Sequence, residues 1–564
     1  MAQNFRGADL LVRALQAAGV TRIFTLSGNH IMEVFDALVG SGIEIVHTRH
    51  EAAAVHMADA YARLSGRVGV AMVTGGQGHA NAAAALPTAL AGEVPVLLLS
   101  GHAPLAELGD GAFQELPQAA MAAPVTKAAW TAQTAAGLGA DVARAMATAL
   151  SGRPGPVHLS LPTDVLEARI PDTAAPPPAA FAAVPMPLPA ATAAMVAELV
   201  ASAARPVLIA PPSLVTPAGM AALAALEAAC GLPAVPMNAP RGLADPTLGA
   251  LAGLLPQADL VVLLGKPLDF TTRFGRPAAH ARFIVLDPEA ALIGRAQRLL
   301  GERLVLGAIA DPISAVTALT TALRRVPAQA EWAAHARDMV AWRPAEWAAL
   351  AGAPAGPIHP ATLCHAINDA LAEQGDATFI CDGGEVGQWG HGMVRTADAR
   401  APAGAPTRAP AGAPARAPAG ATRRITNGVA GAIGVGLPFA IGARAAVARP
   451  TLALMGDGSF GFHMAELDTA ARHRLPFVCV IGNDSRWNAE HQIQIRDYGA
   501  NRAHGCELAP GTRYDLVATA LGGHGERVED AAELRPALAR AFAAGRPAVV
   551  NVMIAGQPAP TLKR

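Results

Sequence analysis

Short apolar runs alternate along most of the chain with alanine-rich stretches in which leucine and other apolar residues recur at helical spacing. Many of these runs end directly in Gly, Asp or Asn, as in RIFTLSG, VGVAMVTGG, LVVLLG, ATFICDGG, TLALMGDG and PFVCVIGND. Apolar strands followed by helices predict parallel sheets covered on both faces, the doubly wound α/β class. Ligands bind such sheets beyond the carboxyl ends of the strands, where these polar residues lie.

Two proline-rich stretches interrupt this alternation. One, PDTAAPPPAAFAAVPMPLPA, follows residue 170, and the other, RPAEWAALAGAPAGP, precedes residue 358. Both compositions are typical of linkers. A chain of 564 residues is also too long for a single hydrophobic core. We therefore expect three α/β domains, at 1–170, 190–325 and 357–564.

A repeat of the form R-A-P-A-G-A-P interrupts the third domain between residues 399 and 423. Arg400, Arg408 and Arg416 recur in it at intervals of eight residues. A segment of Pro, Gly and Ala cannot bury a core, so we expect a mobile surface insertion. An arginine-bearing tether for a polyanion is the functional alternative, and replication slippage in a GC-rich coding sequence is the simpler explanation.

The overall charge is nearly balanced, with 43 basic and 44 acidic residues, which argues against a nucleic acid or an anionic membrane as partner. We expect a small-molecule substrate instead. None of the apolar runs reaches the ~18 residues that a membrane span needs. The five cysteines show no metal-ligand spacing and no disulfide framework, and the first residues lack the apolar core of a signal peptide. These features favour a cytoplasmic protein.

The strongest chemical signal is a Gly-Asp-Gly-Ser turn between the strand TLALM and a helix. Backbone amides in such a turn can approach a phosphate, and a neighbouring carboxylate can share a Mg²⁺ with it. Asp and Gly are also common in ordinary turns, so the turn alone is weak evidence. A second strand, PFVCVIG, supplies Asp484 27 positions after Asp457, however. We expect a diphosphate and metal site formed by Gly456, Asp457, Gly458, Ser459 and Asp484.

This segment resembles the signature of the thiamine diphosphate (ThDP) enzymes, in which G-D-G is followed by a paired N-N. The resemblance implies that Asp457, Asp484 and the backbone carbonyl of Arg486 coordinate Mg²⁺. Asp484 stands where the family has the second Asn. A hard oxygen ligand is kept and a negative charge is added beside the diphosphate, so metal affinity or preference is expected to differ while the role persists.

Glu51 follows the strand IEIVH and opens a helix containing HMADAYARLSG. An isolated glutamate there would be interpreted as an acid that stabilises a helix N-terminus. The resemblance implies a catalytic role, because a glutamate at this place in ThDP enzymes hydrogen-bonds the aminopyrimidine ring. It promotes the imino form, whose nitrogen removes the thiazolium C2 proton to give the ylide. The protein supplies orientation and electrostatics, and the cofactor carries the carbanion chemistry.

Further segments match this family in the same order along most of the chain. LSGNH (26–30) and TGGQGHAN (74–81) resemble the substrate-side and pyrimidine-side loops of the first domain, and GRPGPVHLSLPTDV (152–165) resembles its closing strand. GAIGVGLPFAIGA (431–443) resembles the segment in which a glycine carbonyl meets the aminopyrimidine and an apolar residue bends the cofactor. CDGG (381–384) resembles a further diphosphate loop. The cofactor-binding residues implied are Thr74, Asn81, Gly383, Gly384, Gly431 and Ile433.

A dinucleotide-binding protein would also have glycine-rich loops after its strands. No G-x-G-x-x-G with a downstream ribose-binding acid stands out in this sequence, which disfavours that class.

Within the family, the chain is similar to the acetolactate synthase-like group, which includes benzaldehyde lyase, oxalyl-CoA decarboxylase and 2-hydroxyacyl-CoA lyase. His30 stands where benzaldehyde lyase has an active-site histidine, and imidazole can shuttle a proton near neutral pH. A loop histidine bonded to backbone is the equal alternative. Phe113 and Gln114 stand where the group lines its substrate pocket. Glu490 lies six residues after Asp484, where some ThDP lyases hold a second acid; a helix-start glutamate is the alternative.

The middle segment LLGKPLDFTTRFGRP (263–277) resembles the acyl-CoA-handling members, and Lys266, Arg273 and Arg276 could meet CoA phosphates. Solvated surface charges are the alternative for these three residues. The short tail GQPAPTLKR leaves little for the C-terminal lid of CoA-handling relatives, so CoA use stays a hypothesis.

We expect a ThDP- and Mg²⁺-dependent C–C lyase or carboligase that acts through the ThDP ylide on a 2-hydroxyacyl compound, which includes CoA thioesters, or on a 2-oxo acid. Condensation of two 2-oxo acids, as in acetolactate synthase, is the alternative within the class. A non-catalytic ThDP-fold regulator is the alternative of another class, and the retained Glu51 and metal loop argue against it. The resemblance also implies a homodimer or homotetramer, with the cofactor between the first domain of one chain and the third of its partner.

Overall fold

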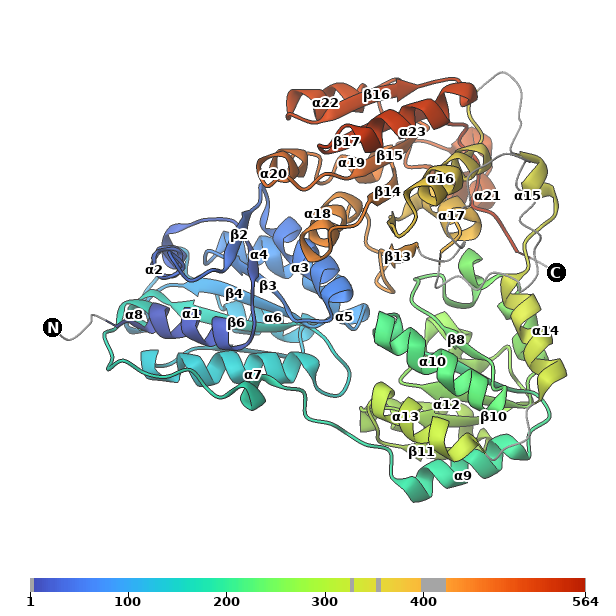
Figure 1. Ribbon diagram of the computed structural model, residues 1–564, viewed down its shortest axis with the longest axis horizontal. Coiled ribbons are helices and arrows are strands. Elements are labelled where there is room, and N and C mark those ends of the chain that lie inside the picture. The colour runs from blue at the N-terminus through green and yellow to red at the C-terminus, as the bar shows by residue number, and fades with distance from the viewer. Residues whose placement is uncertain (1–4, 325–328, 351–356, 397–421, 563–564) are drawn as a thin grey trace. The chain divides into compact units, whose positions relative to one another are not determined.

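The computed structural model describes residues 5–324, 329–350, 357–396 and 422–562 (Figure 1). These residues form two compact units. The first comprises Met1–Pro185 with Ile441–Val447, and the second comprises Met186–Ala440 with Ala448–Arg564. The described residues contain one parallel sheet in the first unit and two in the second, which confirms the predicted α/β class.

The first unit is built on a six-stranded sheet in the order β2-β1-β3-β4-β6-β5. The strands are β1 (Arg22–Thr25), β2 (Glu44–His47), β3 (Gly69–Val73), β4 (Val96–His102), β5 (Ala128–Thr131) and β6 (Val157–Pro162). The helices are α1 (Gly7–Ala17), α2 (Met32–Ala37), α3 (Glu51–Ser65), α4 (Gln77–Ala83), α5 (Leu86–Ala91), α6 (Gln118–Ala122), α7 (Leu138–Leu150) and α8 (Thr163–Glu167). Helices α1 and α7 lie on one side of the sheet and α3 on the other (Figure 1). Because both faces are covered, β3, β4 and β6 are buried along their whole length.

The second unit begins with a five-stranded sheet in the order β11-β10-β9-β7-β8. Its strands are β7 (Pro206–Ala210), β8 (Ala234–Pro236), β9 (Leu260–Leu264), β10 (Arg282–Leu286) and β11 (Leu304–Ala308). The helices of this region are α9 (Ala190–Ala201), α10 (Pro217–Cys230), α11 (Leu251–Leu254), α12 (Ala290–Leu300), α13 (Pro312–Leu323), α14 (Ala330–Ala341) and α15 (Glu346–Ala349). Apolar clusters lie on both faces of the sheet, as the continuous apolar runs predicted.

The third sheet, also in the second unit, has six strands in the order β13-β12-β14-β15-β17-β16. They are β12 (Thr378–Cys381), β13 (Arg423–Thr426), β14 (Thr451–Gly456), β15 (Val478–Asn483), β16 (His524–Val528) and β17 (Ala548–Met553). The helices are α16 (Pro360–Gln374), α17 (Gly384–Met393), α18 (Gly436–Ala446), α19 (Asp457–Phe460), α20 (Glu466–Arg472), α21 (Asn488–Tyr498), α22 (Tyr514–Ala520) and α23 (Leu534–Ala543). Numbered from its own first strand, this sheet repeats the strand order of the first one.

The strands without a predicted apolar run lie mainly at sheet edges. β11 alternates half-buried and exposed positions, and β16 has the sequence HGERV. Edge strands have one neighbour and need fewer apolar side chains, so they lack the signal that marked the central strands. β13 begins at Arg423, the last residue of the predicted insertion. Residues 399–421 of that insertion, with Arg400, Arg408 and Arg416, lie outside the described residues.

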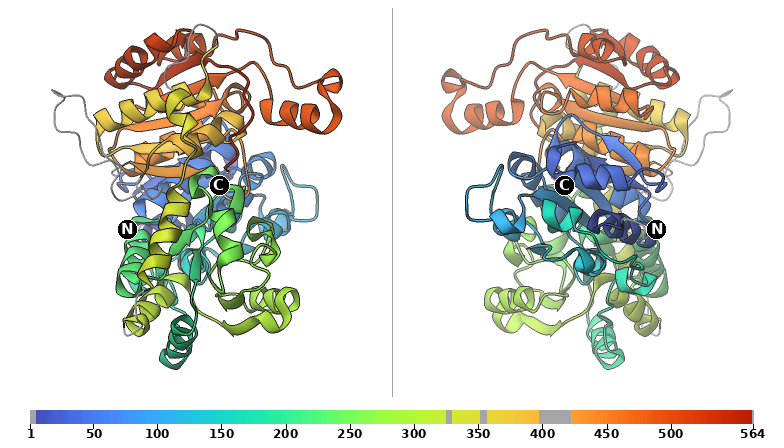
Figure 2. Two further views of the ribbon diagram at one scale, coloured as in Figure 1. Left: turned by 90° about the vertical axis from the view of Figure 1, so that its right-hand side faces the viewer. Right: turned by 90° about the vertical axis from the view of Figure 1, so that its left-hand side faces the viewer.

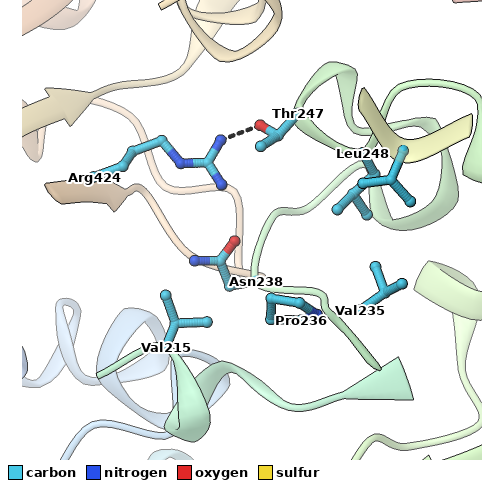
Figure 3. A pocket seen from close by; sticks show the side chains of 8 residues that line it. Val215, Val235, Pro236, Asn238, Thr247, Leu248 and Arg424 are labelled. Atoms are coloured by element: carbon cyan, nitrogen blue, oxygen red, sulfur yellow. Dashed lines mark hydrogen bonds between the residues drawn. The ribbon is translucent and has the colours of Figure 1, made fainter. Parts of the chain in front are cut away.

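A buried arginine on β13 contacts the chain segment that connects β8 and β9. Arg424 is only 8% exposed, and its guanidinium donates to the Thr247 hydroxyl and approaches Nδ1 of His391 at 3.1 Å. Figure 3 shows it pointing at Thr247 across a small pocket whose other walls include Val215, Pro236 and Asn238. A buried guanidinium is tolerated only when its N–H groups find acceptors, so these contacts tie β13 to the turn Pro246–Leu248, between β8 and β9, and to α17.

Replacing Arg424 by Met is expected to destabilise the second unit by about 2–3 kcal/mol, because buried polar groups lose their partner. Arg423→Met, which removes the half-exposed arginine next to it, should cost less than about 1 kcal/mol. Urea unfolding followed by tryptophan fluorescence measures both variants. Equal losses of stability would show that Arg424 contributes no more than its half-exposed neighbour Arg423.

Candidate active site

Glu51 is the first residue of α3, directly after β2 and its short connection. The His50 side chain caps this helix by accepting the Ala52 amide at 3.1 Å. Asn81 on α4 donates its Nδ2 to Glu51 Oε2 at 3.0 Å. A side chain on Gly78 would place its Cβ 3.5 Å from Glu51 Oε1. The fold therefore brings Glu51 and Asn81 together, with glycine backbone beside the second carboxylate oxygen.

His30 and Thr74 also meet at the carboxyl ends of the strands. The distance from His30 Nδ1 to Thr74 Oγ1 is 3.1 Å, and the imidazole stacks on Phe113 with 5.8 Å between ring centroids. The ring is 4% exposed, and burial lowers the pKa of His30 below its ordinary value. The histidine is therefore neutral near pH 7 and held from two sides. Gly28 packs so closely on Thr74 that a Cβ would lie 2.4 Å from Thr74 Cβ.

Gln114 has a strained backbone, with φ of +56°, which a side-chain-bearing residue adopts at a cost. Its Cβ would lie 2.7 Å from any Cβ placed on Gly76, so the two residues are in contact. Among the described residues, Gln114 Oε1 is a buried oxygen without a hydrogen-bond partner. Such an oxygen can accept a hydrogen bond from a bound molecule.

A buried polar cluster beneath these loops was missed in the sequence. Gln118 is 1% exposed, accepts the Gly76 amide at 2.9 Å, and donates to Gly101 O and Ser160 Oγ at 3.1 Å each. His79 Nδ1 lies 2.9 Å from Ser100 Oγ, and its ring centroid is 4.4 Å from that of His158. The available signal was the polar pair within the apolar strand VHLSLP, where His158 and Ser160 share one face. This cluster fixes the position of Gly76, the residue immediately before α4.

Because His79 and His158 are buried, we expect the protein to lose stability in acid. Burial lowers the pKa of His79 to about 4, and burial with repulsion from His79 lowers the pKa of His158 well below 6.5. The unfolded chain takes up these protons first, so stability present at pH 7 is lost as pH falls through 6.5 towards 4. His79 alone should cost about 2 kcal/mol between pH 7 and pH 5.

Urea unfolding of the wild type and of His79→Gln at both pH values measures this loss. The variant cannot titrate at this position, so its stability should depend less steeply on pH. A variant with the wild-type dependence would show that His79 is protonated equally in the folded and unfolded chain.

The second unit gathers most of the residues expected to hold the diphosphate and metal. A pocket at the carboxyl ends of β14 and β15 is lined by Gly384, Ile433, Gly456, Asp457, Gly458, Ser459, Asp484, Arg486 and Glu490, together with Trp487 and Asn488. Gly383 is adjacent, since its Cβ would lie 2.5 Å from Ile433 Cγ2. Gly431 has φ of +70° and packs on Pro240, outside the lining of this pocket.

Two partly buried carboxylates face this pocket. Burial raises the pKa of Asp457 to about 6, against the lowering effect of backbone amides that include Ser485 and Arg486. Burial, and then repulsion by Asp457, raises the pKa of Asp484 to about 7. Two hard oxygen groups that repel each other at low exposure are a donor set that a divalent cation relieves.

The glycine turn packs closely against Trp487. A Cβ on Gly458 would lie 2.8 Å from the Trp487 ring, so only glycine fits between that ring and the helix start. Asp382 is fully buried, and its carboxylate accepts the amides of Gly383 at 2.6 Å and Gly436 at 2.9 Å. This carboxylate ties the loop after β12 to the start of α18. The residues present therefore fit a bound diphosphate with its cation.

Glu490 lies in the first turn of α21 and is exposed at the rim of the pocket. Figure 2 shows this helix, in orange-red, projecting from the rest of its unit. Only Asn488 and His491 of α21 are buried. The position therefore suits contact with a bound molecule as well as the helix-start role.

The three basic residues of the middle segment 263–277 differ in their exposure to solvent. Lys266, two residues after the end of β9, is 2% exposed, so the expectation of an accessible or solvated lysine there is wrong. Arg273 and Arg276 are exposed, and Arg276 lies over the Phe274 ring at 5.7 Å.

All five cysteines are buried and free. Within the described residues, no group of three or more His, Cys, Asp or Glu side chains forms a metal site, and no helix is long and apolar enough to cross a membrane.

Comparison with known proteins agrees with this architecture. The N-terminal TPP binding domain of thiamine pyrophosphate enzymes matches residues 5–121, and the C-terminal TPP binding domain matches residues 411–552. The acetolactate synthase large subunit IlvG of Mycobacterium tuberculosis is 33% identical over 98% of this chain and 96% of its own length. The 2-hydroxyacyl-CoA lyase 2 of Bos taurus is 30% identical over 98% of this chain and 90% of its own length. The 2-hydroxyacyl-CoA lyase 2 of Homo sapiens is 29% identical over 97% of this chain and 90% of its own length.

Both domain matches coincide with the two regions in which the expected cofactor residues lie. Glu51 and Asn81 fall within the first match, and Asp457 and Asp484 within the second. The relatives extend the similarity over nearly the whole chain. The chain belongs to the thiamine pyrophosphate enzyme family, in the group that includes acetolactate synthases and 2-hydroxyacyl-CoA lyases.

Proposed function

We propose that the protein is a ThDP- and Mg²⁺-dependent C–C lyase or carboligase that acts on a 2-hydroxyacyl compound, which includes CoA thioesters, or on a 2-oxo acid. The observation that carries this proposal is Glu51 at the start of α3, with one carboxylate oxygen bound by Asn81 and the other beside Gly78. Bound ThDP supplies a nucleophilic carbon that adds to a carbonyl and an electron sink for the carbanion left by C–C cleavage. A protein that only binds the cofactor has no need of an oriented glutamate at this place.

The metal and diphosphate would be held by the second unit. Asp457, Asp484 and the backbone carbonyl of Arg486 are the proposed Mg²⁺ ligands, and the partly buried carboxylates, with the repulsion of Asp484 by Asp457, support this assignment. Backbone amides of the Gly456–Ser459 turn and of the α17 start at Gly384 would meet the phosphate oxygens.

The first unit supplies groups for the substrate. A neutral His30 can accept a proton from a 2-hydroxy group and return it, which a cleavage reaction requires. The buried Gln114 Oε1 can accept a hydrogen bond from a different donor group of the bound molecule. Glu490 is proposed separately as a further acid or base. These groups favour substrates with a hydroxyl next to a carbonyl.

Condensation of two 2-oxo acids is the second candidate, and the 33% identity to the mycobacterial acetolactate synthase subunit favours it. For the lyase candidate, the exposed Arg273 and Arg276 could meet phosphates of a CoA thioester, whereas the buried Lys266 does not support such a contact. We further propose a homodimer or homotetramer, which size-exclusion chromatography with light scattering would test.

Purified protein with ThDP and Mg²⁺, offered pyruvate, benzoin and a 2-hydroxyacyl-CoA in parallel, tests the proposal. Cleavage of benzoin or of the thioester supports the lyase. Turnover of pyruvate alone would replace it by the condensation. Tight ThDP binding without turnover of any of the three would favour the non-catalytic regulator.

A further inference from the structure

Gln77, the first residue of α4, is linked to Glu51 by a chain of two hydrogen bonds. Its Nε2 donates to Asn81 Oδ1 at 3.0 Å, and Asn81 Nδ2 donates to Glu51 Oε2 at 3.0 Å. Residues four apart on a helix lie on the same face, so α4 presents both amides to the carboxylate at the start of α3. Gln77 itself is exposed, so its contact with Asn81 is not a consequence of core packing.

The chain of hydrogen bonds has a direction. An ionised carboxylate only accepts hydrogen bonds, so Asn81 must turn its NH₂ group towards Glu51 and its oxygen away. Gln77 meets that oxygen with its own NH₂ group. Gln77 therefore reinforces the orientation in which the NH₂ end of the Asn81 amide faces Glu51.

The arrangement also gives the two carboxylate oxygens of Glu51 different surroundings. Within the described residues, Asn81 is the side chain that hydrogen-bonds to this carboxylate, and it engages Oε2. Oε1 lies by the backbone of Gly78, where a Cβ would approach to 3.5 Å. One oxygen is thus held by the protein, and the other is left for a donor outside the chain.

We propose that Gln77 is a positioning residue, which acts through Asn81 to hold Glu51 as an acceptor with Oε1 presented to the aminopyrimidine ring of ThDP. The proposal rests on the function proposed above, because it assigns Glu51 to the cofactor. Gln77 touches neither cofactor nor substrate in this role.

Gln77→Glu and Gln77→Ala separate this role from simple loss of a side chain. Glutamate cannot donate at neutral pH, so the Asn81 amide meets it only by rotating, which turns Asn81 Oδ1 against Glu51 Oε2. Alanine removes the orienting donor but leaves Asn81 free to keep its bond to Glu51. The glutamate variant is therefore expected to be the more damaging of the two.

The probes are ThDP affinity, measured by calorimetry with saturating Mg²⁺, and the rate at which the C2 proton of bound ThDP exchanges with deuterium. Gln77→Glu should weaken binding and slow exchange about tenfold each, and Gln77→Ala about two- to threefold. Gln16→Glu is the matched control, because Gln16 is also exposed and donates to a backbone carbonyl, that of Ser41. It should change neither quantity.

The same Gln77→Glu change in an Asn81→Ala background completes the test. Without the Asn81 amide, the charge at position 77 should change ThDP affinity and the C2 exchange rate less than about twofold. The relay, in which Gln77 acts on Glu51 through Asn81, is overturned by either of two results. One is that Gln77→Glu and Gln77→Ala change ThDP affinity and C2 exchange equally. The other is that the larger effect of Gln77→Glu persists in the Asn81→Ala background. C2 exchange without turnover of any substrate would reject the proposed reaction and leave the relay supported, whereas a wild type that binds no ThDP would overturn both.

Discussion

Glu51→Gln is expected to lower kcat about 10²- to 10⁴-fold with whichever substrate is turned over, while ThDP still binds. Glutamine keeps the shape and the Asn81 contact of the native side chain, but it cannot exchange a proton with the cofactor. The loss should therefore be much larger in kcat and in C2-proton exchange than in the affinity for ThDP.

Glu44→Gln is the matched control for this variant. Glu44 lies at the other end of β2, where it pairs with Arg22 at 2.7 Å. Its replacement should leave kcat within about twofold, because an exposed ion pair contributes little. If Glu51→Gln retained more than a tenth of the wild-type kcat, the catalytic assignment of Glu51 would be wrong.

The second large effect is expected at the two carboxylates of the metal loop. Asp457→Asn should lower the apparent Mg²⁺ affinity about 100-fold or more, since it removes a charge and places an amide donor where backbone amides of Ser485 and Arg486 already donate. Asp484→Asn should change the affinity less than about tenfold, because the amide keeps an oxygen ligand and the repulsion by Asp457 disappears.

Titration of ThDP-dependent turnover with Mg²⁺, after treatment with a chelator, measures both variants. The relief of repulsion has a further consequence: without metal, Asp484→Asn should be more thermally stable than the wild type at pH 8, where both native carboxylates are ionised. Equal Mg²⁺ affinity in the wild type and in Asp457→Asn would place the metal elsewhere.

The sequence pattern was most informative where local chemistry decides structure. Central strands such as β3 and β14 are buried on both sides and read as continuous apolar runs. The turn at Gly456–Ser459 was recognisable because its glycines and carboxylate are adjacent in the chain. The pattern was least informative at the edges, where β11 and β16 carry mixed side chains.

The Gln118 cluster shows the other limit. Its members lie on separate elements: Gln118 bonds to Gly76 before α4 and to Ser160 on β6, and His79 on α4 bonds to Ser100 on β4. No interval along the chain connects such residues, and only the strand order brings them together. The contact between Asn81 and Glu51 was likewise unpredictable in detail, although both residues stood in segments identified by their resemblance to the family.

The shared strand order of the first and third sheets bears on the history of the molecule. β3 and β14 hold the same rank in their sheets, and so do β4 and β15. The loop after β3 leads to Asn81, the loop after β14 carries Asp457, and Asp484 follows β15. Descent from one duplicated ancestral unit would leave this pattern, with one copy specialised for an organic base and the other for phosphate and metal.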